Sequence, residues 1–124
     1  MTSFICLLVL LQLKHWFIDF VVQLEPAAPH KFKFNDHKAI AHSVQHGLGT
    51  ALAFVLVFPY MPWIGISAGI VDMVVHHVID YGKTKIDIAF PWSQRGRFFI
   101  IGVDQLMHQF TYLAAVVTLL WILP

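Results

Sequence analysis

Charged residues are scarce in this sequence, and cysteine is nearly absent. Only 12% of the 124 residues are Asp, Glu, Lys or Arg, whereas roughly a quarter is usual for soluble domains. The single cysteine, Cys6, excludes an intrachain disulfide. The formal net charge of +1 gives no basic footprint, so nucleic acid is not expected as a partner.

The first apolar run lacks the marks of a secretory signal. No Lys or Arg precedes Ser3, no small-x-small cleavage site follows Leu13, and the apolar stretch continues through Val22. We therefore predict that this run is a membrane span.

Apolar residues make up most of the chain instead. They account for 58% of it, with a mean hydropathy of +0.70, more than one small soluble core could bury. They gather in four runs, each long enough at about 1.5 Å per residue to cross about 30 Å of hydrocarbon. We predict an all-α fold, a four-helix transmembrane bundle. Residues 1–124 would form one integral membrane domain with spans at about 3–23, 39–58, 63–81 and 97–123.

The expected connections suggest an orientation in the membrane. The segment 59–62 has proline at both ends, which predicts a tight turn between two helices. The polar connections 24–38 and 82–96 hold or adjoin seven of the eight Lys and Arg residues. The positive-inside rule then places both connections in the cytoplasm and both termini outside it.

Each predicted helix carries two ionisable residues four positions apart, which places both on one helix face. The pairs lie near the ends of the first and third spans and near the beginnings of the second and fourth. Because the chain reverses at each connection, all four pairs are predicted to lie at one level, in the cytoplasmic half of the membrane. The pairs are His15 and Asp19, His42 and His46, His76 and Asp80, and Asp104 and His108.

Eight such groups at one depth need a common partner, because each costs about 2.5–3.5 kcal/mol to insert into hydrocarbon. Imidazole and carboxylate are usual ligands of Zn, Mn and Fe, and four-helix bundles hold one or two such ions with inward-facing ligands. One pair alone would indicate a hydrogen-bonded helix contact. The alignment of four pairs favours a divalent metal site, with proton handling as the alternative.

Other polar residues fit more than one role. Asp72, Gln23 and His77 fit either support of the site or a purely structural role, and the spacing to Asp80 favours His76 over His77 as the inward ring.

Three further side chains are assigned no part in the site. His30 and His37 fall in a polar connection and are expected to be solvated. Lys14 points about 100° away from its neighbour around the helix, and is expected to extend toward the interface or pair with an acid.

Small residues follow the polar pairs and predict close helix packing. They are Gly47, Gly49, Ala51 and Ala53 in the second span and Gly65, Ser67, Ala68 and Gly69 in the third.

Three strings carry a resemblance to a known family. They are His15-x-x-x-Asp19-Phe20-x-x-Gln23, His76-x-x-x-Asp80-Tyr81-x-Lys83 and Asp104-Gln105-x-x-His108. Over nearly its whole length the chain resembles DUF3307, a domain-of-unknown-function family of small bacterial and phage multipass membrane proteins. The resemblance implies a bacterial or phage origin, with the bacterial inner membrane as the expected location, and assigns no activity. A looser similarity links the motifs to membrane-bound metal-dependent hydrolases.

The leading hypothesis is a metal-dependent hydrolase of a membrane-embedded substrate, with one or two divalent ions (Zn, Mn or Fe) held by the eight paired residues. The lipid bilayer is the expected partner, and a homo-oligomer is an open alternative. Competing hypotheses are a metal-ion or proton transporter or channel, a haem-binding electron carrier and a non-catalytic membrane accessory protein.

Overall fold

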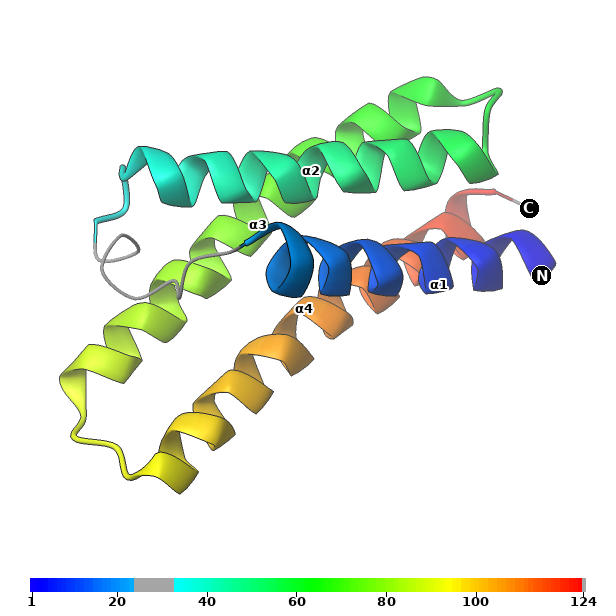
Figure 1. Cartoon of the computed structure of the whole chain (residues 1–124). Helices are drawn as coiled ribbons and strands as arrows, with labels where there is room; N and C mark the ends of the chain where they lie inside the picture. Colours follow the sequence, from blue (N-terminus) through cyan, green and yellow to red (C-terminus); the bar gives the residue numbers. More distant parts are fainter. Residues whose placement is uncertain (24–32, 124) are drawn as a thin grey trace.

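The computed structural model describes residues 1–23 and 33–123, which form four helical spans and no strand. The first span joins an α-helix, α1 (Thr2–Phe17), to a π-helix, η1 (Ile18–Val22). The others are α2 (His37–Val57), α3 (Pro62–Ala89) and α4 (Gln94–Ile122) (Figure 1). Each span is long and apolar enough to cross a membrane, which confirms the predicted all-α, four-helix transmembrane fold.

Local sequence signals explain where the helices begin. The Asp36 side chain caps α2 by accepting hydrogen bonds from the backbone N–H groups of Lys38 and Ala39. Pro62 opens α3 at a position where its missing N–H has no cost. Ser93 caps α4 by accepting from the Gly96 N–H at 3.2 Å. The predicted turn at 59–62 is confirmed, because α2 ends at Val57.

The predicted connection at 82–96 is wrong, because most of it is helical. Helix α3 continues to Ala89 and α4 begins at Gln94, so only residues 90–93 lie outside helices. Gly82 alone weakens a helix by about 1 kcal/mol, and the first proline after it is Pro91. The 28 residues of α3 reach about 42 Å at 1.5 Å per residue, longer than the ~30 Å hydrocarbon core. A helix of this length either tilts in the bilayer or extends past the hydrocarbon.

The other polar connection, predicted at 24–38, is described only from Lys33 onward, so His30 lies outside the described residues. His37 is the first residue of α2 and is exposed, as its predicted solvation requires.

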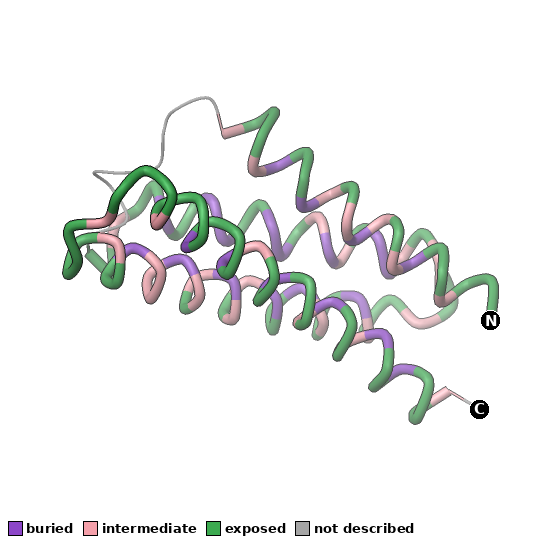
Figure 2. Tube along the Cα trace, turned by 90° about the horizontal axis from the view of Figure 1, so that it is seen from below, coloured by how far each residue is buried: buried purple, intermediate pink, exposed green. Residues whose placement is uncertain are grey.

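The chain runs back and forth along one axis. The N-terminus, the end of α4 and the α2–α3 turn lie at one end of the molecule, and the beginning of α2 and the α3–α4 turn lie at the other (Figure 1). Helices α2 and α3 pack against each other more extensively than any other pair of described helices. Buried positions recur along the helices (Figure 2). This up-and-down order brings the end of the first span to the level of the beginning of α2.

Polarity is distributed as the bilayer requires, with apolar side chains outside and a polar interior. Leu48, Leu52 and Leu56 on the outer face of α2 are 66%, 59% and 64% exposed. Near the end with the termini the interior is an apolar cluster, whereas the middle of the bundle buries histidine, aspartate and threonine. The buried members of the apolar cluster are Leu7, Leu11, Ala53, Phe54, Tyr112, Val116 and Leu119.

Glycine allows α2 and α3 to touch through their backbones. A Cβ on Gly47 would lie 2.6 Å from the Gly69 carbonyl oxygen, and a Cβ on Gly69 would lie 2.5 Å from the Gly47 oxygen. Two rigid backbones cannot both accommodate a methyl group there, which confirms the close packing predicted for these residues.

We expect Gly47→Ala to destabilise the protein by about 1–3 kcal/mol, because the added methyl group overpacks the α2–α3 contact. Gly102→Ala is the matched control, since nothing lies within 4 Å of a Cβ at that helical glycine. The control should leave stability unchanged or raise it by up to about 1 kcal/mol. Thermal unfolding in one detergent measures both. Equal stability of the two variants would contradict the close contact.

Candidate metal centre

The structure brings all eight predicted site residues into one cluster between the four spans. They fall into three overlapping groups, and within each group one nitrogen or oxygen atom per residue lies within 4.8 Å of the others. The groups are Asp19, His42, His46 and His76; His15, His76 and His108; and Asp80, Asp104 and His108. The predicted common level of the four pairs is therefore observed.

The cluster is almost completely shielded. His46 is 0% exposed, and His76 and His108 are each 1% exposed. The most accessible member is Asp19, with 16% of its side chain exposed. Any group that binds here is held by protein side chains and not by bulk water.

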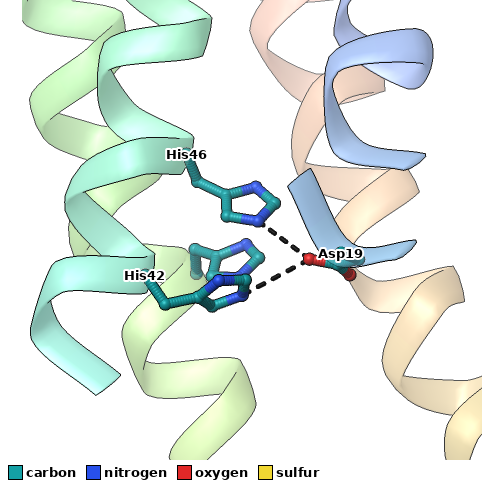
Figure 3. A group of neighbouring side chains, drawn as sticks. Asp19, His42 and His46 are labelled. Carbon is teal, nitrogen blue, oxygen red and sulfur yellow. Dashed lines mark hydrogen bonds and ion pairs between the residues drawn. The ribbon is translucent and has the colours of Figure 1, made fainter. Parts of the chain in front are cut away.

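Asp19 links the first span to two others. It lies in η1, where the wider π-helical turn closes with a hydrogen bond from the Gln23 N–H to the Ile18 carbonyl. Its Oδ1 lies 2.9 Å from Nε2 of His46 and 3.3 Å from Nε2 of His42. Figure 3 draws both contacts as dashed lines. Its Oδ2 lies 3.2 Å from Nε2 of His15. One carboxylate therefore faces three imidazoles.

His76 occupies the centre of the cluster. Its ring stacks between those of His46 and His108, with centroid distances of 3.6 and 4.1 Å. The neighbouring His77 points elsewhere, with Nδ1 3.1 Å from Ser43 Oγ and Nε2 2.6 Å from the Phe34 carbonyl oxygen. The inward orientation predicted for His76 is confirmed, and His77 ties α3 to α2 and to the chain before it.

The third group, formed by Asp80, Asp104 and His108, contains two carboxylates and is called the acidic group here. It lies between α3 and α4. Nε2 of His108 is 3.4 Å from Asp80 Oδ1 and 3.7 Å from Asp104 Oδ1. Among the described residues, His108 Nε2 and Asp104 Oδ1 are buried and have no hydrogen-bond partner, and neither does His76 Nδ1. Leaving such an atom unsatisfied costs about 1–3 kcal/mol.

These separations match what one shared cation requires. Two atoms bound tetrahedrally to Zn²⁺ at about 2.0 Å each lie roughly 3.3 Å apart. In the acidic group, His108 Nε2 and Asp80 Oδ1 are 3.4 Å apart. In the first group, the Nε2 atoms of His42 and His76 are 3.3 Å apart. Nitrogen and carboxylate donors in this number suit Zn, Mn or Fe. The donors present therefore fit a divalent ion.

A buried ion pair between Lys14 and Asp72 adjoins the cluster. Lys14 Nζ donates to Asp72 Oδ2 at 2.8 Å, and both side chains are at most 10% exposed. Thr50 Oγ1 donates to the same carboxylate oxygen at 2.6 Å. Lys14 Nζ also donates to the His46 carbonyl oxygen at 3.1 Å and lies 3.4 Å from His46 Nδ1. Lys14 thus pairs with an acid, one of its two predicted outcomes, and joins that pair to the metal centre.

Two residues of α4 orient His15. The hydroxyl of Tyr112 lies 2.8 Å from Nδ1 of His15, and Gln105 Oε1 lies 3.1 Å from Nε2. Gln105 Nε2 also donates to Asp19 Oδ2 at 3.4 Å. Such contacts hold ligand side chains in place.

A simple signal would have found some of these supporting residues. Thr50 lies four residues after His46, and Tyr112 lies four residues after His108, so each continues the stripe of its pair by one turn. Lys14 carries no such signal, because its partner depends on which helix packs beside that face of α1.

Comparison with known proteins places the chain in a family without giving it an activity. No curated protein and no solved structure matches it. The family model described as "Protein of unknown function (DUF3307)" matches residues 7–123, nearly the whole chain, so the protein belongs to the DUF3307 family that its motifs resemble.

Proposed function

We propose that this protein is a metal-dependent membrane hydrolase that cleaves a membrane-embedded substrate. The observation that carries the proposal is the acidic group, where a buried imidazole nitrogen and a buried carboxylate oxygen without hydrogen-bond partners lie 3.7 Å apart. Asp80, Asp104 and His108 would hold the first ion, and the Asp19, His42, His46 and His76 group offers a second position.

A bound divalent ion would supply Lewis-acid chemistry and a water molecule that loses its proton readily. The chain's own residues have two tasks beside it. Gln105 Nε2, 3.5 Å from Asp104 Oδ2, helps to orient that carboxylate. The buried walls exclude bulk water, which strengthens every charge interaction inside.

With only the first ion bound, Asp19 is the candidate general base, because it lies outside the acidic group and is the most accessible carboxylate of the cluster. It would take the proton of the attacking water while the water oxygen bonds to the carbonyl carbon or phosphorus of the substrate. The bond to the leaving oxygen breaks, and that oxygen receives the proton back from Asp19. The histidines around Asp19 would hold its orientation through both transfers.

The alternatives fit the interior less well. A transporter needs a polar path through both halves of the membrane, but Leu7, Leu11 and Phe54 belong to an apolar cluster that packs the half near the termini. A haem would need open space between its axial histidines, whereas the His46 and His76 rings stack at 3.6 Å. A non-catalytic accessory protein is the remaining alternative, and metal analysis tests it.

The orientation also belongs to this proposal. Lys83, Lys85, Arg95 and Arg97 lie at the α3–α4 end. Lys38 lies in the first turn of α2, and Lys33 precedes that helix. We propose that this basic end faces the cytoplasm, because cytoplasmic ends carry the excess of Lys and Arg. The bacterial origin and the homo-oligomer remain predictions.

Elemental analysis of the purified protein tests the proposed function. Wild type should carry one or two equivalents of Zn, Mn or Fe per chain, and His46→Ala and Asp80→Asn should carry less. His37→Ala is the control, because His37 is exposed at the beginning of α2. Chelator treatment should abolish hydrolysis of lipid esters in vesicles, and the metal found in wild type should restore it.

Negligible metal in all four proteins would remove the hydrolase as proposed. Metal at full occupancy in Asp80→Asn would exclude the acidic group as the first position. A metal-loaded protein that hydrolyses neither acyl nor phosphate esters would favour the accessory role.

A further inference from the structure

A groove lies between α3 and α4, on the side of the metal centre toward the termini. Its volume is about 620 Å³, and small side chains such as Ala68, Ala115 and Thr118 line it. Val71 and Phe110 also line it and are 58% and 55% exposed, so the groove opens to the outside of the bundle. In a membrane the outside of the bundle is lipid.

The floor of the groove touches the metal centre. Asp72, Thr50 and Tyr112 line the groove and are buried. The Tyr112 hydroxyl contacts His15 Nδ1 at 2.8 Å, and the lysine paired with Asp72 lies 3.4 Å from His46 Nδ1. A molecule in the groove therefore has one end beside the His/Asp cluster.

The dimensions of the groove suit one hydrocarbon chain. Along α3 it runs from Val75 to Ile64, about 16 Å at 1.5 Å per residue, which is long enough to hold much of one extended acyl chain. Most of its lining is apolar. Within a bilayer the chemistry that fills an apolar groove of this length is an acyl chain, because an empty groove would lose dispersion contacts on both walls.

The opposite side of the metal centre is basic. The last turns of α3 and the first turn of α4 carry Lys83, Lys85, Arg95 and Arg97 against one acid, Asp87. These residues lie at the end where the two helices join (Figure 1). Each basic residue near a membrane surface attracts an anionic lipid by about 1 kcal/mol.

We propose that the α3–α4 groove holds an acyl chain of an anionic phospholipid whose phosphate headgroup pairs with the basic end of the same two helices. Along α3 the order is Lys83, Asp80, His76 and then Ala68. The bonds that join chain to headgroup therefore lie beside the His/Asp cluster. This inference rests on the proposed hydrolase and names its substrate class.

Photolabelling tests the assignment without requiring turnover. Wild-type protein is reconstituted in phosphatidylcholine vesicles that contain a little phosphatidic acid with a diazirine at the end of one acyl chain. Chelator is present throughout, and mass spectrometry locates the label. We expect label on groove residues of α3 and α4, and several-fold less when the same diazirine is carried by phosphatidylcholine.

Two kinds of variant separate chain binding from headgroup binding. Ala115→Trp on α4 and Ala68→Leu on α3 fill the groove and should each lower labelling several-fold, whereas Ala41→Trp on the exposed face of α2 should not. Arg97→Gln should lower labelling by phosphatidic acid about five-fold, the equivalent of ~1 kcal/mol. Lys33→Gln is its control, since Lys33 is exposed outside α3 and α4. Thermal unfolding identifies any variant that fails to fold.

Label spread evenly over the lipid-facing surface, or unchanged by both groove-filling variants, would overturn the inference. Equal labelling by the two lipids would overturn the headgroup assignment. Specific groove labelling in a protein that binds no metal would support the lipid site and reject the hydrolase. Metal binding without groove labelling would reject the lipid site and leave the metal centre supported.

Discussion

His108→Phe is expected to lower the affinity for a divalent metal by at least about 100-fold, because even residues that only orient ligands contribute 10–100-fold. His108 belongs to two of the three groups that could hold an ion, including the acidic group. A phenyl ring keeps the stacking against His76, whose ring centroid lies 4.1 Å away, but offers no nitrogen. The metal-to-protein ratio measured after dialysis against a metal buffer gives the result.

His77→Phe is the matched control for this substitution. His77 lies in the middle of α3, as His108 lies in the middle of α4. Its nitrogens, however, face the Ser43 hydroxyl and the Phe34 carbonyl oxygen, and His77 belongs to none of the three groups that could hold an ion. We expect its metal affinity to equal that of wild type. Equal metal loss in both variants would show that the effect reflects damage to the bundle and not loss of a ligand.

A second readout checks the same prediction through stability. A ligand that binds only the folded protein stabilises it by about 2.7 kcal/mol at 100 times its Kd. Added metal should therefore raise the unfolding temperature of wild type and of His77→Phe by similar amounts and that of His108→Phe by clearly less. An unfolding temperature of wild type that does not respond to Zn, Mn or Fe would contradict a metal centre.

Lys14→Met is expected to destabilise the protein by about 3–5 kcal/mol, the usual cost of breaking a buried ion pair. The substitution leaves Asp72 inside the bundle with Thr50 as its remaining hydrogen-bond partner among the contacts described above. The Asp72 side chain is 4% exposed, so water cannot replace the lysine. Thermal unfolding in detergent measures the loss.

The double variant Lys14→Met with Asp72→Asn separates charge from packing. Removing both charges avoids an unpaired carboxylate, and an asparagine oxygen can still accept from the Thr50 hydroxyl. We expect the double variant to recover most of the lost stability. A double variant as unstable as Lys14→Met alone would mean that the lysine stabilises the bundle through its packing and not through its charge.

The fold and the level of the polar site could be predicted from local information. Span length against bilayer thickness gives four helices, and strict reversal of the chain aligns His15 with His46, His76 and His108. The family follows from the same strings. These inferences needed only spacing along single helices and the alternation of direction between them.

Helix lengths were harder to predict, because polarity marks the edge of the membrane and not the end of a helix. The polarity of Lys83 and Lys85 predicts a connection, yet both residues lie within α3. The π-helical turn around Asp19 had no signal in the sequence either, since it depends on how the end of the first span meets α2 and α4.

By itself, the sequence determined that this is a four-span membrane protein with eight histidines and aspartates at one depth, because hydropathy and a spacing of four are properties of each helix alone. Only the tertiary structure decided which atoms face one another. It pairs Lys14 with Asp72, places Tyr112 against His15 and forms a groove between α3 and α4. The physical reason is that those contacts depend on the rotation and separation of neighbouring helices, which small residues such as Gly47 and Gly69 set through backbone contact.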